Sequence, residues 1–451
     1  KNRYAWRVCA GHCRPAKPGG QKLNPLWKRH VYMYLDDLLA KQKQGEARGI
    51  FSVCSAHPYV IQQTLKTCHA FNIPPLIEAT CNQVNQFGGY TGMQPADFVK
   101  YVYGIAEKDH FPVNRIILGG DHLGPSVWQH ESEKVAMPKA EDLIHHYIKA
   151  GFQKIHLDCS MRLADDPPGP LSVEVSSKRA ARLARVAEDT GSVNVRYVIG
   201  TEVPVPGGTT EYEDSVQVSR IEDVFRTIEV TRNEFYKAGL HAAWERVIAV
   251  VVQPGVEFGD DFVLPYQPEK ATELSRFIED HPLVYEAHST DYQTRQALSN
   301  LVRDHFAILK VGPVLTFAFR EAVFLLARVE NELKSTDTRS NIVQVLDEVM
   351  EKQPQYWRNY YQGNEQEIAH KRKFSFSDRI RYYWTQPAVQ RAFDQLMTNL
   401  SSQALSVELL EELAPELFVE DSTQAQFTAE QVIAAKIQLV LSDYAEACNP
   451  K

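Results

Sequence analysis

The chain has 451 residues, of which 44% are apolar and 24% are charged. This composition is typical of a soluble globular protein with one large domain and an appendage, or with two to three ordinary domains. The formal net charge of −8 argues against nucleic acid as a partner. No apolar run approaches the ~18–20 residues that a membrane-spanning helix needs, so we expect no membrane span.

Residues 1–33 differ from the rest of the chain. The segment is basic, rich in glycine and proline, and lacks the apolar periodicity of a core-forming element. It also lacks the uninterrupted apolar stretch of a secretory signal. We therefore expect a disordered arm or an upstream extension that lies outside the folded domains.

The seven cysteines show no disulfide-scaffold spacing. Cys54, Cys81 and Cys159 lie inside strand-like runs, where a free cysteine behaves as a small buried apolar residue. This usage favours a reducing compartment, and we expect a cytoplasmic protein.

Eight short apolar runs follow the arm, and each ends in small or polar residues. They lie at 49–57, 75–83, 115–124, 154–161, 194–204, 246–255, 283–291 and 307–316. The runs are rich in β-branched residues and almost continuously apolar, which is typical of parallel strands buried on both faces. Amphipathic helices are expected between them, for example at 176–191 and 268–281.

Eight strand–helix units in about 280 residues predict an α/β fold, a (β/α)8 TIM barrel, over residues 34–320. A doubly wound open sheet is the alternative. Polar residues at the end of every predicted strand favour the closed barrel, because its loops converge on one axis.

The strand pattern stops after residue 320, and residues 321–451 read as a helical C-terminal extension. Helices are expected at 320–333, 340–352, 377–384, 387–400 and 428–447. Ser377 and Thr428 are the predicted N-caps, and Thr428 with Gln431 has the spacing of a capping box. These helices must bury their apolar faces on the barrel or on a partner.

Ionisable and amide side chains gather at the predicted strand ends, where a barrel of this kind builds its active site. They are Ser55, His57, Glu78, Asn82, Gln83, Asp121, His122, His156, Asp158, Ser160, Thr201, Glu202, Gln253, Glu257, Glu286, His288, Asp291 and Lys310. Strand alternation puts His156 and Asp158 on one face, and likewise Glu286 and His288. A group of His, Asp and Glu around one opening can bind a divalent cation such as zinc, manganese or magnesium.

Each of these residues also has a structural interpretation. A single strand-end histidine is more often structural than a metal ligand, and we expect this of His57 and His156. His145 and His146 fall in a helix and are expected to be solvated. Glu78, inside an apolar strand, could be an internal salt-bridge partner of Lys310.

Several motifs occur in a fixed order along the chain. They are "SVCSAHP", "IEATCNQVNQFGGYTGM", "RIILGGDHLGP", "GFQKIHLDCSM", "YVIGTEVPVPGG", "YEAHSTDYQ", "LKVGP" and "FSFSDRIRYYW". Together they resemble the D-tagatose-1,6-bisphosphate aldolase subunit family, whose members are the so-called non-catalytic subunits. The resemblance extends from about residue 34 to near the C-terminus.

The resemblance implies a barrel similar to those of class II, zinc-dependent aldolases. It also implies a catalytic class II partner subunit, which cleaves tagatose 1,6-bisphosphate during galactitol or N-acetylgalactosamine breakdown and depends on this subunit for activity and stability. Some relatives are described as sugar-phosphate 4-epimerases.

The motifs carry site residues over by resemblance. Asp121 and His122 fall where a class II aldolase has its acid and a zinc histidine, and His288 where it has another. The remaining metal histidine is replaced by Glu202. Residues 289–291, Ser-Thr-Asp, stand where class II enzymes have a glycine-rich phosphate loop, and an acid there would repel phosphate.

Two functions therefore stay open, and both involve a sugar phosphate. In the first, the chain is an accessory subunit without turnover of its own. In the second, it is a stand-alone metal-dependent 4-epimerase or aldolase, with a zinc or manganese ion at His122, Glu202 and His288, and with Asp121 or Asp158 moving the proton of the C4 hydroxyl.

Substrate contacts are expected from polar residues of the strand ends and the extension, namely Asn82, Gln83, Gln253, Lys310, Arg379 and Arg381. The two arginines could hold a phosphate or could equally be helix-surface charges. A homo-oligomer is compatible with either function. A kinase is excluded, because the chain has no glycine-rich loop ending in Gly-Lys-Ser/Thr.

Overall fold

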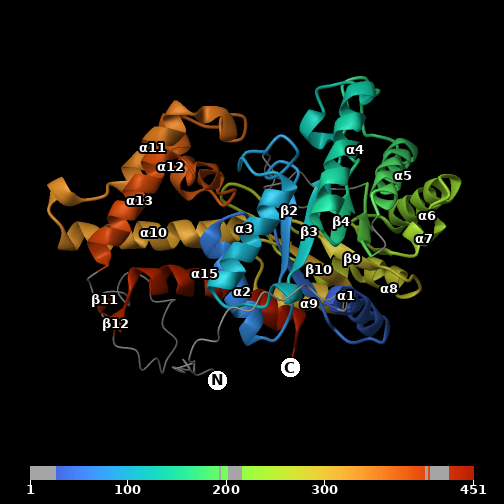
Figure 1. Ribbon diagram of the computed structural model, residues 1–451, viewed down its shortest axis with the longest axis horizontal. Coiled ribbons are helices and arrows are strands. Elements are labelled where there is room, and N and C mark those ends of the chain that lie inside the picture. The colour runs from blue at the N-terminus through green and yellow to red at the C-terminus, as the bar shows by residue number, and fades with distance from the viewer. Residues whose placement is uncertain (1–26, 192–193, 202–215, 402–404, 407–425, 451) are drawn as a thin grey trace, which may run out of the picture.

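The computed structural model describes residues 27–191, 194–201, 216–401, 405–406 and 426–450 (Figure 1). Its barrel and its C-terminal helices form two adjoining parts, with α10 running from one into the other. None of the helices in the described residues combines the length and the apolarity needed to cross a bilayer.

Eight parallel strands close into a barrel in the order β1-β10-β9-β6-β5-β4-β3-β2, which confirms the predicted (β/α)8 fold. Their bounds are β1 (Ile50–Val53), β2 (Leu76–Thr80), β3 (Ile117–Leu123), β4 (Lys154–Leu157), β5 (Arg196–Ile199), β6 (Val247–Val251), β9 (Val284–Ala287) and β10 (Phe306–Val311). Most of the predicted runs extend past the observed strands, because their polar last residues belong to the loops that shape the barrel mouth.

Helices surround the barrel on the outside. They are α2 (Pro58–Ala70), α3 (Pro95–Lys108), α4 (Glu133–Ala150), α5 (Val173–Asp189), α6 (Ile221–Lys237), α7 (His241–Trp244), α8 (Thr272–Glu279), α9 (Arg295–Arg303) and α10 (Pro313–Leu333). A short hairpin, β7 (Glu257–Phe258) and β8 (Val263–Leu264), follows the sixth barrel strand. Sequence periodicity did not predict this hairpin, since each of its strands has only two residues.

Helix α1 (Trp27–Lys43) closes the amino end of the barrel. Its Leu35 and Leu38 are buried in one cluster with interior residues of the strands, including Ile50, Leu76 and Ile117. The helix begins inside the segment expected to be a disordered arm, and residues 1–26 of that arm lie outside the described part of the chain. With one end of the barrel filled by apolar side chains, the polar strand ends face the other opening.

The C-terminal extension begins within a barrel helix. Helix α10 crosses the predicted boundary at residue 320, so the barrel and the extension share this element. The extension adds α11 (Ile342–Lys352), α12 (Glu365–Phe374), α13 (Pro387–Leu400), the hairpin β11 (Leu405–Ser406) and β12 (Gln426–Phe427), and α15 (Ala429–Cys448). Helix α15 returns to the barrel, where it packs against α2, α9 and α10 (Figure 1).

The prediction of an α-helix over 377–384 with Ser377 as its N-cap is wrong. A short 3-10 helix forms over Arg379–Tyr383, and it is preceded by Asp378 at a φ of 46°. The side chain of Asp378 is buried and accepts hydrogen bonds from Thr316 Oγ1 at 2.6 Å and Arg320 Nε at 3.2 Å. These contacts with α10 hold the backbone at Asp378 in a conformation that an α-helix cannot contain.

The predicted capping box of the last helix is confirmed. Thr428 Oγ1 accepts from the Gln431 backbone N–H at 3.2 Å, and Gln431 Oε1 accepts from the Thr428 N–H at 2.8 Å. We expect Thr428→Ala to lower the free energy of unfolding by about 1 kcal/mol in a urea titration. Thr398→Ala, at an exposed position inside α13, is the control and is expected to be neutral or slightly stabilising. Equal effects of the two substitutions would contradict the capping role.

Candidate metal centre and pocket

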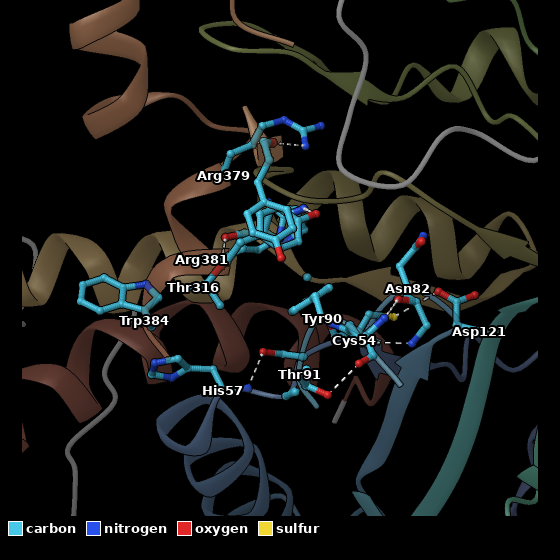
Figure 2. Close-up of a pocket in the computed structure, with 18 of the residues that line it drawn as sticks. Cys54, His57, Asn82, Tyr90, Thr91, Asp121, Thr316, Arg379, Arg381 and Trp384 are labelled. Atoms are coloured by element: carbon cyan, nitrogen blue, oxygen red, sulfur yellow. Dashed lines mark hydrogen bonds between the residues drawn. The ribbon is translucent and has the colours of Figure 1, made fainter. Parts of the chain in front are cut away.

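A cavity of about 990 Å³ opens at the carboxyl end of the barrel. Barrel loops supply one side of its lining and the C-terminal extension supplies the other. Figure 2 shows Asn82 and Asp121 on the barrel side, with Arg379 and Trp384 reaching the cavity from the extension. The extension therefore completes the wall of the site as well as covering the outside of the barrel.

Three histidines lie together at the barrel side of this cavity, where His122 and His288 line it and His156 packs against both. The ring centroids of His122, His156 and His288 lie 5.0–5.3 Å from one another. All three side chains are buried. They come from the ends of β3, β4 and β9, and the closed barrel brings these strands around one axis.

Each imidazole has its own carboxylate partner. His122 Nδ1 lies 2.8 Å from Asp158 Oδ2, and His156 Nδ1 lies 3.0 Å from Asp121 Oδ1. His288 Nε2 lies 3.0 Å from Glu286 Oε1. A carboxylate bound to one ring nitrogen fixes the orientation of the imidazole and makes its other nitrogen a better metal ligand.

The donor set fits a divalent cation. Ligand atoms of Asp121, His156, Glu286 and His288 all lie within 4.8 Å of one another. His156 Nε2 is buried and has no hydrogen-bond partner. When His156 donates a hydrogen bond from Nδ1 to Asp121, its Nε2 presents a lone pair. A buried lone pair is costly unless a hydrogen-bond donor or a metal ion binds it. Imidazole and carboxylate together suit zinc or manganese.

A buried ion network lies beneath the histidines. Lys154 Nζ is 2.7 Å from Glu78 Oε1 and 2.6 Å from Glu286 Oε2. Lys310 pairs with the other oxygen of Glu78, as predicted, and its Nζ lies 2.7 Å from Asp121 Oδ1. Two ammonium groups thus face three carboxylates, so the network has a net negative charge that a bound cation would offset.

The same charges set the ionisation of the site. Burial opposes ionisation of Asp121, but His122, Lys310 and the hydrogen bond from His156 outweigh it and hold the pKa of Asp121 well below its usual range. Burial lowers the pKa of His288 to about 4. At neutral pH the site therefore contains an ionised Asp121 and a neutral His288, the protonation states in which each binds a metal.

Comparison with known proteins identifies the family. A family model described as D-tagatose-1,6-bisphosphate aldolase subunit GatZ/KbaZ-like matches residues 35–449. The chain belongs to this family. Its barrel mouth, with the paired Asp121 and His122, is therefore the barrel mouth of a GatZ/KbaZ-like protein.

Relatives match almost over their full length. A protein named D-tagatose-1,6-bisphosphate aldolase subunit GatZ from Klebsiella pneumoniae is 53% identical over 421 residues, which are 92% of this chain and 99% of the relative. The protein of that name from Salmonella typhimurium is 51% identical with the same coverage. A solved structure from Sinorhizobium meliloti, titled a probable tagatose 6 phosphate kinase, has a TM-score of 0.82 and 45% identity, and covers 89% of this chain and all of that one.

The GatZ/KbaZ-like site brings together several of the residues predicted from the sequence. Asp121, His122, Asp158 and His288 all line the cavity. Glu202, the predicted third metal ligand, lies outside the described residues. Asn82 is exposed in the cavity wall, and Lys310 reaches the cavity although its ammonium group is held by Glu78 and Asp121.

The two predicted glutamines are bound to backbone groups. Gln83 accepts from the Thr80 N–H at 2.9 Å and donates to the Cys54 carbonyl at 3.3 Å, so it joins the loops after β1 and β2. Gln253 accepts from the N–H groups of Gly255 and Val256 at 2.8 and 3.1 Å. The carboxamide oxygen of Gln253 therefore stabilises its own loop.

The two predicted arginines come from the extension and are anchored within it. Arg381 Nη1 donates to the carbonyls of Ser377 and Asp378, and its Nη2 donates to Tyr382 Oη at 2.9 Å. Arg379 Nη1 donates to the Tyr356 carbonyl at 3.0 Å, while its Nε has no partner although it is buried. Both side chains line the cavity, so each can add a contact to a ligand without leaving its anchor.

The structure adds His156 and Glu286 to the cluster. Sequence reasoning placed each on the same strand face as a predicted site residue but treated His156 as structural. The alternation in "HLD" and "EAH" was the available signal, because residues two apart on a strand point the same way. Because β3, β4 and β9 converge in the barrel, His156 and Glu286 lie beside Asp121 and His288, and the pattern of a single strand does not show this.

Proposed function

We propose that this chain is the GatZ-type subunit of a D-tagatose-1,6-bisphosphate aldolase and supports a catalytic class II partner subunit in the breakdown of tagatose 6-phosphate. The observation that carries this proposal is the relationship to proteins of that name, at 50–53% identity over 92% of the chain. The five cysteines known to be free are compatible with a reducing compartment.

A second function is favoured by a specific observation, the intact cluster of buried donors around His156 Nε2. We propose that Asp121, His156, Glu286 and His288 hold a divalent cation, with His122 beside them. A cation bound there would act as a Lewis acid on a carbonyl oxygen of a ketose phosphate. A site of this kind could support 4-epimerisation or aldol cleavage by this chain alone.

The chain's own residues would then have distinct tasks. Cys54 Sγ and His122 Nε2 each lie 3.6 Å from Asp121 Oδ2, and Asp121 lines the cavity, so this oxygen can accept a hydrogen bond from a ligand hydroxyl group. Asp158 receives hydrogen bonds from His122 and from the Ser160 hydroxyl at 2.6 Å, which suits it to orient His122. Buried Lys310 holds Asp121 in its ionised form.

Activity assays separate the two functions. The purified chain would be tested alone with zinc, manganese or no added metal, on tagatose 1,6-bisphosphate, tagatose 6-phosphate and fructose 6-phosphate. The accessory function predicts no turnover by the chain alone, and a rise in the activity or lifetime of an added class II aldolase subunit. Metal-dependent turnover that Asp121→Asn removes would instead establish the second function.

We do not propose a kinase function for this chain, although the solved Sinorhizobium structure has a kinase title. The sequence contains no Gly-Lys-Ser/Thr ending of a phosphate-binding loop. That loop, with its lysine, is one of the cradles of backbone amides that hold a nucleotide phosphate chain.

A further inference from the structure

The loop after β9 sends a carboxylate to the start of α10. Asp291 Oδ1 accepts hydrogen bonds from the backbone N–H groups of Gly312 at 3.0 Å and Val314 at 2.9 Å. Pro313 between them has no N–H, so the Asp291 oxygen binds both amides that this turn presents. The Asp291 side chain is only 3% exposed. An anion thus already sits at the N-terminus of a 21-residue helix.

The position of this contact matters in a (β/α)8 barrel. In such folds the loops after the seventh and eighth strands, together with a helix N-terminus, frequently form the phosphate-binding site. Here β9 and β10 are the seventh and eighth barrel strands, and the two amides follow β10 directly. Asp291 and Gly312 also line the cavity that contains His288 and Asp121.

The loop is held firmly in this conformation. Ser289 and Tyr292, on either side of the acid, have φ values of 53° and 63°, which residues other than glycine rarely adopt. Thr290 Oγ1 donates to the Lys310 carbonyl at 2.6 Å, which ties the loop to β10. Two left-handed residues in one short loop store strain, and surrounding contacts must maintain them.

The C-terminal extension provides those contacts. Tyr444 Oη in α15 donates to the Thr290 carbonyl at 2.7 Å. Tyr292 Oη donates to the Phe376 carbonyl at 2.6 Å, and the two rings stack with centroids 4.8 Å apart. Phe376 lies between α12 and α13, so two separate parts of the extension hold the loop that carries Asp291.

We propose that Asp291 is a specificity-determining residue that fills the phosphate cradle at the start of α10 and excludes a ligand phosphate from this point of the cavity. A second anion there would face the carboxylate at short range and would find both amides already bonded. The ligand that fits presents a hydroxyl group to this end, and a ketose monophosphate is favoured over a ketose bisphosphate. Only the preference for a ketose monophosphate over a bisphosphate rests on the proposed sugar-phosphate function.

Titration of the metal-free protein with inorganic phosphate tests the inference. Burial raises the pKa of Asp291 to about 6, so the carboxylate is ionised at pH 7.5. By calorimetry at this pH, we expect no saturable phosphate binding to the wild type. Asp291→Ala frees the two amides and is expected to raise phosphate affinity about tenfold or more. Asp291→Asn removes the charge but keeps an oxygen on the amides, and is expected to bind phosphate more weakly than Asp291→Ala.

A control variant and a second measurement keep the inference open to refutation. Glu332→Ala removes an exposed acid near the other end of α10, outside the cavity lining, and should leave phosphate affinity unchanged. If Asp291→Ala does not fold, competition between fructose 6-phosphate and fructose 1,6-bisphosphate on the wild type and Asp291→Asn replaces it. Asp291→Asn removes the charge, and should therefore weaken the wild type's preference for the monophosphate.

Phosphate binding to the wild type that Asp291→Ala leaves unchanged or weakens would overturn the inference, as would wild-type preference for the bisphosphate. The phosphate titration needs neither metal, partner subunit nor turnover. Failure of the accessory function would therefore leave its result intact, and a negative titration would leave the accessory function intact.

Discussion

Replacing Glu78 with glutamine is expected to lower the free energy of unfolding by about 1–3 kcal/mol, because one of two buried ammonium groups loses its hydrogen bond to Glu78, while Lys154 keeps Glu286 and Lys310 keeps Asp121 as partners. Glu78 is fully buried, and its two oxygens each face a different lysine, Lys154 and Lys310. Glutamine has the same shape but offers one oxygen only, and its NH₂ group would point at the second ammonium group. Chemical denaturation of the metal-free protein measures the loss.

Glutamate and glutamine have nearly the same size, so the change in the free energy of unfolding reports the electrostatic effect. Glu78 pairs in register with Gly119 on β3, and a Cβ at Gly119 would come within 2.4 Å of Glu78 Oε1. The glycine therefore leaves room for a side chain of this length, and glutamine fills the same space.

Glu131→Gln is the matched control for Glu78→Gln. Glu131 forms its pair with Lys139 at 2.7 Å, but both side chains are about one-third exposed. Such a pair contributes less than about 1 kcal/mol, because water solvates each charge when the partner is lost. Equal losses in the two variants would show that the buried network does not depend on Glu78.

Replacing His156 with alanine is expected to weaken binding of zinc or manganese about 100-fold or more. The fully buried imidazole supplies a buried donor nitrogen without a hydrogen-bond partner, and its other nitrogen orients Asp121. Alanine removes both contributions. Calorimetric titration and metal analysis after dialysis measure the affinity and the stoichiometry, which is expected to be one ion per wild-type chain.

His146→Ala provides the comparison for His156→Ala. His146 lies on α4 beside Asp142, and its side chain is 37% exposed. Removal of this imidazole should not change metal affinity, because it lies outside the cluster. If His156→Ala bound metal as tightly as the wild type, the ion would have to use other donors, and the assignment of this cluster as the metal centre would be wrong.

The barrel could be predicted from the sequence because parallel strands leave a strong local pattern. Runs such as 246–255 are almost wholly apolar and β-branched, and turn residues end them. Helix α12 left no such pattern. Its sequence, "EQEIAHKRKF", has no apolar stripe, and Arg372 is its one buried residue, paired with Asp347 at 2.6 Å. A helix held by ion pairs and a capping box does not show the apolar period that sequence reasoning depends on.

The candidate site divides along similar lines. Asp121, His122 and His288 could be predicted because they stand at the ends of apolar runs, where a barrel gathers the polar side chains of its mouth. His156 and Glu286 stand next to apolar residues inside β4 and β9, where burial and salt bridges are equally good explanations. The anchoring of Arg381 could not be predicted because it depends on the 3-10 turn, whose carbonyls at Ser377 and Asp378 accept from its guanidinium group. No sequence pattern predicted that Asp291 would reach the amides of Gly312 and Val314.

Helix α15 binds the segment that leads into the first barrel strand. The backbone N–H of Gly49, just before β1, donates to the Cys448 carbonyl at 2.8 Å, and the Cys448 thiol lies against the same glycine. The first barrel strand therefore gains its outer neighbour from a segment far along the chain from it. Folding of the barrel would remain incomplete until α15 docks, with the apolar surfaces of α2, α9 and α10 uncovered in the meantime. Chains in which α15 is deleted should accordingly accumulate as aggregates, and chaperones that bind exposed apolar segments would retain them.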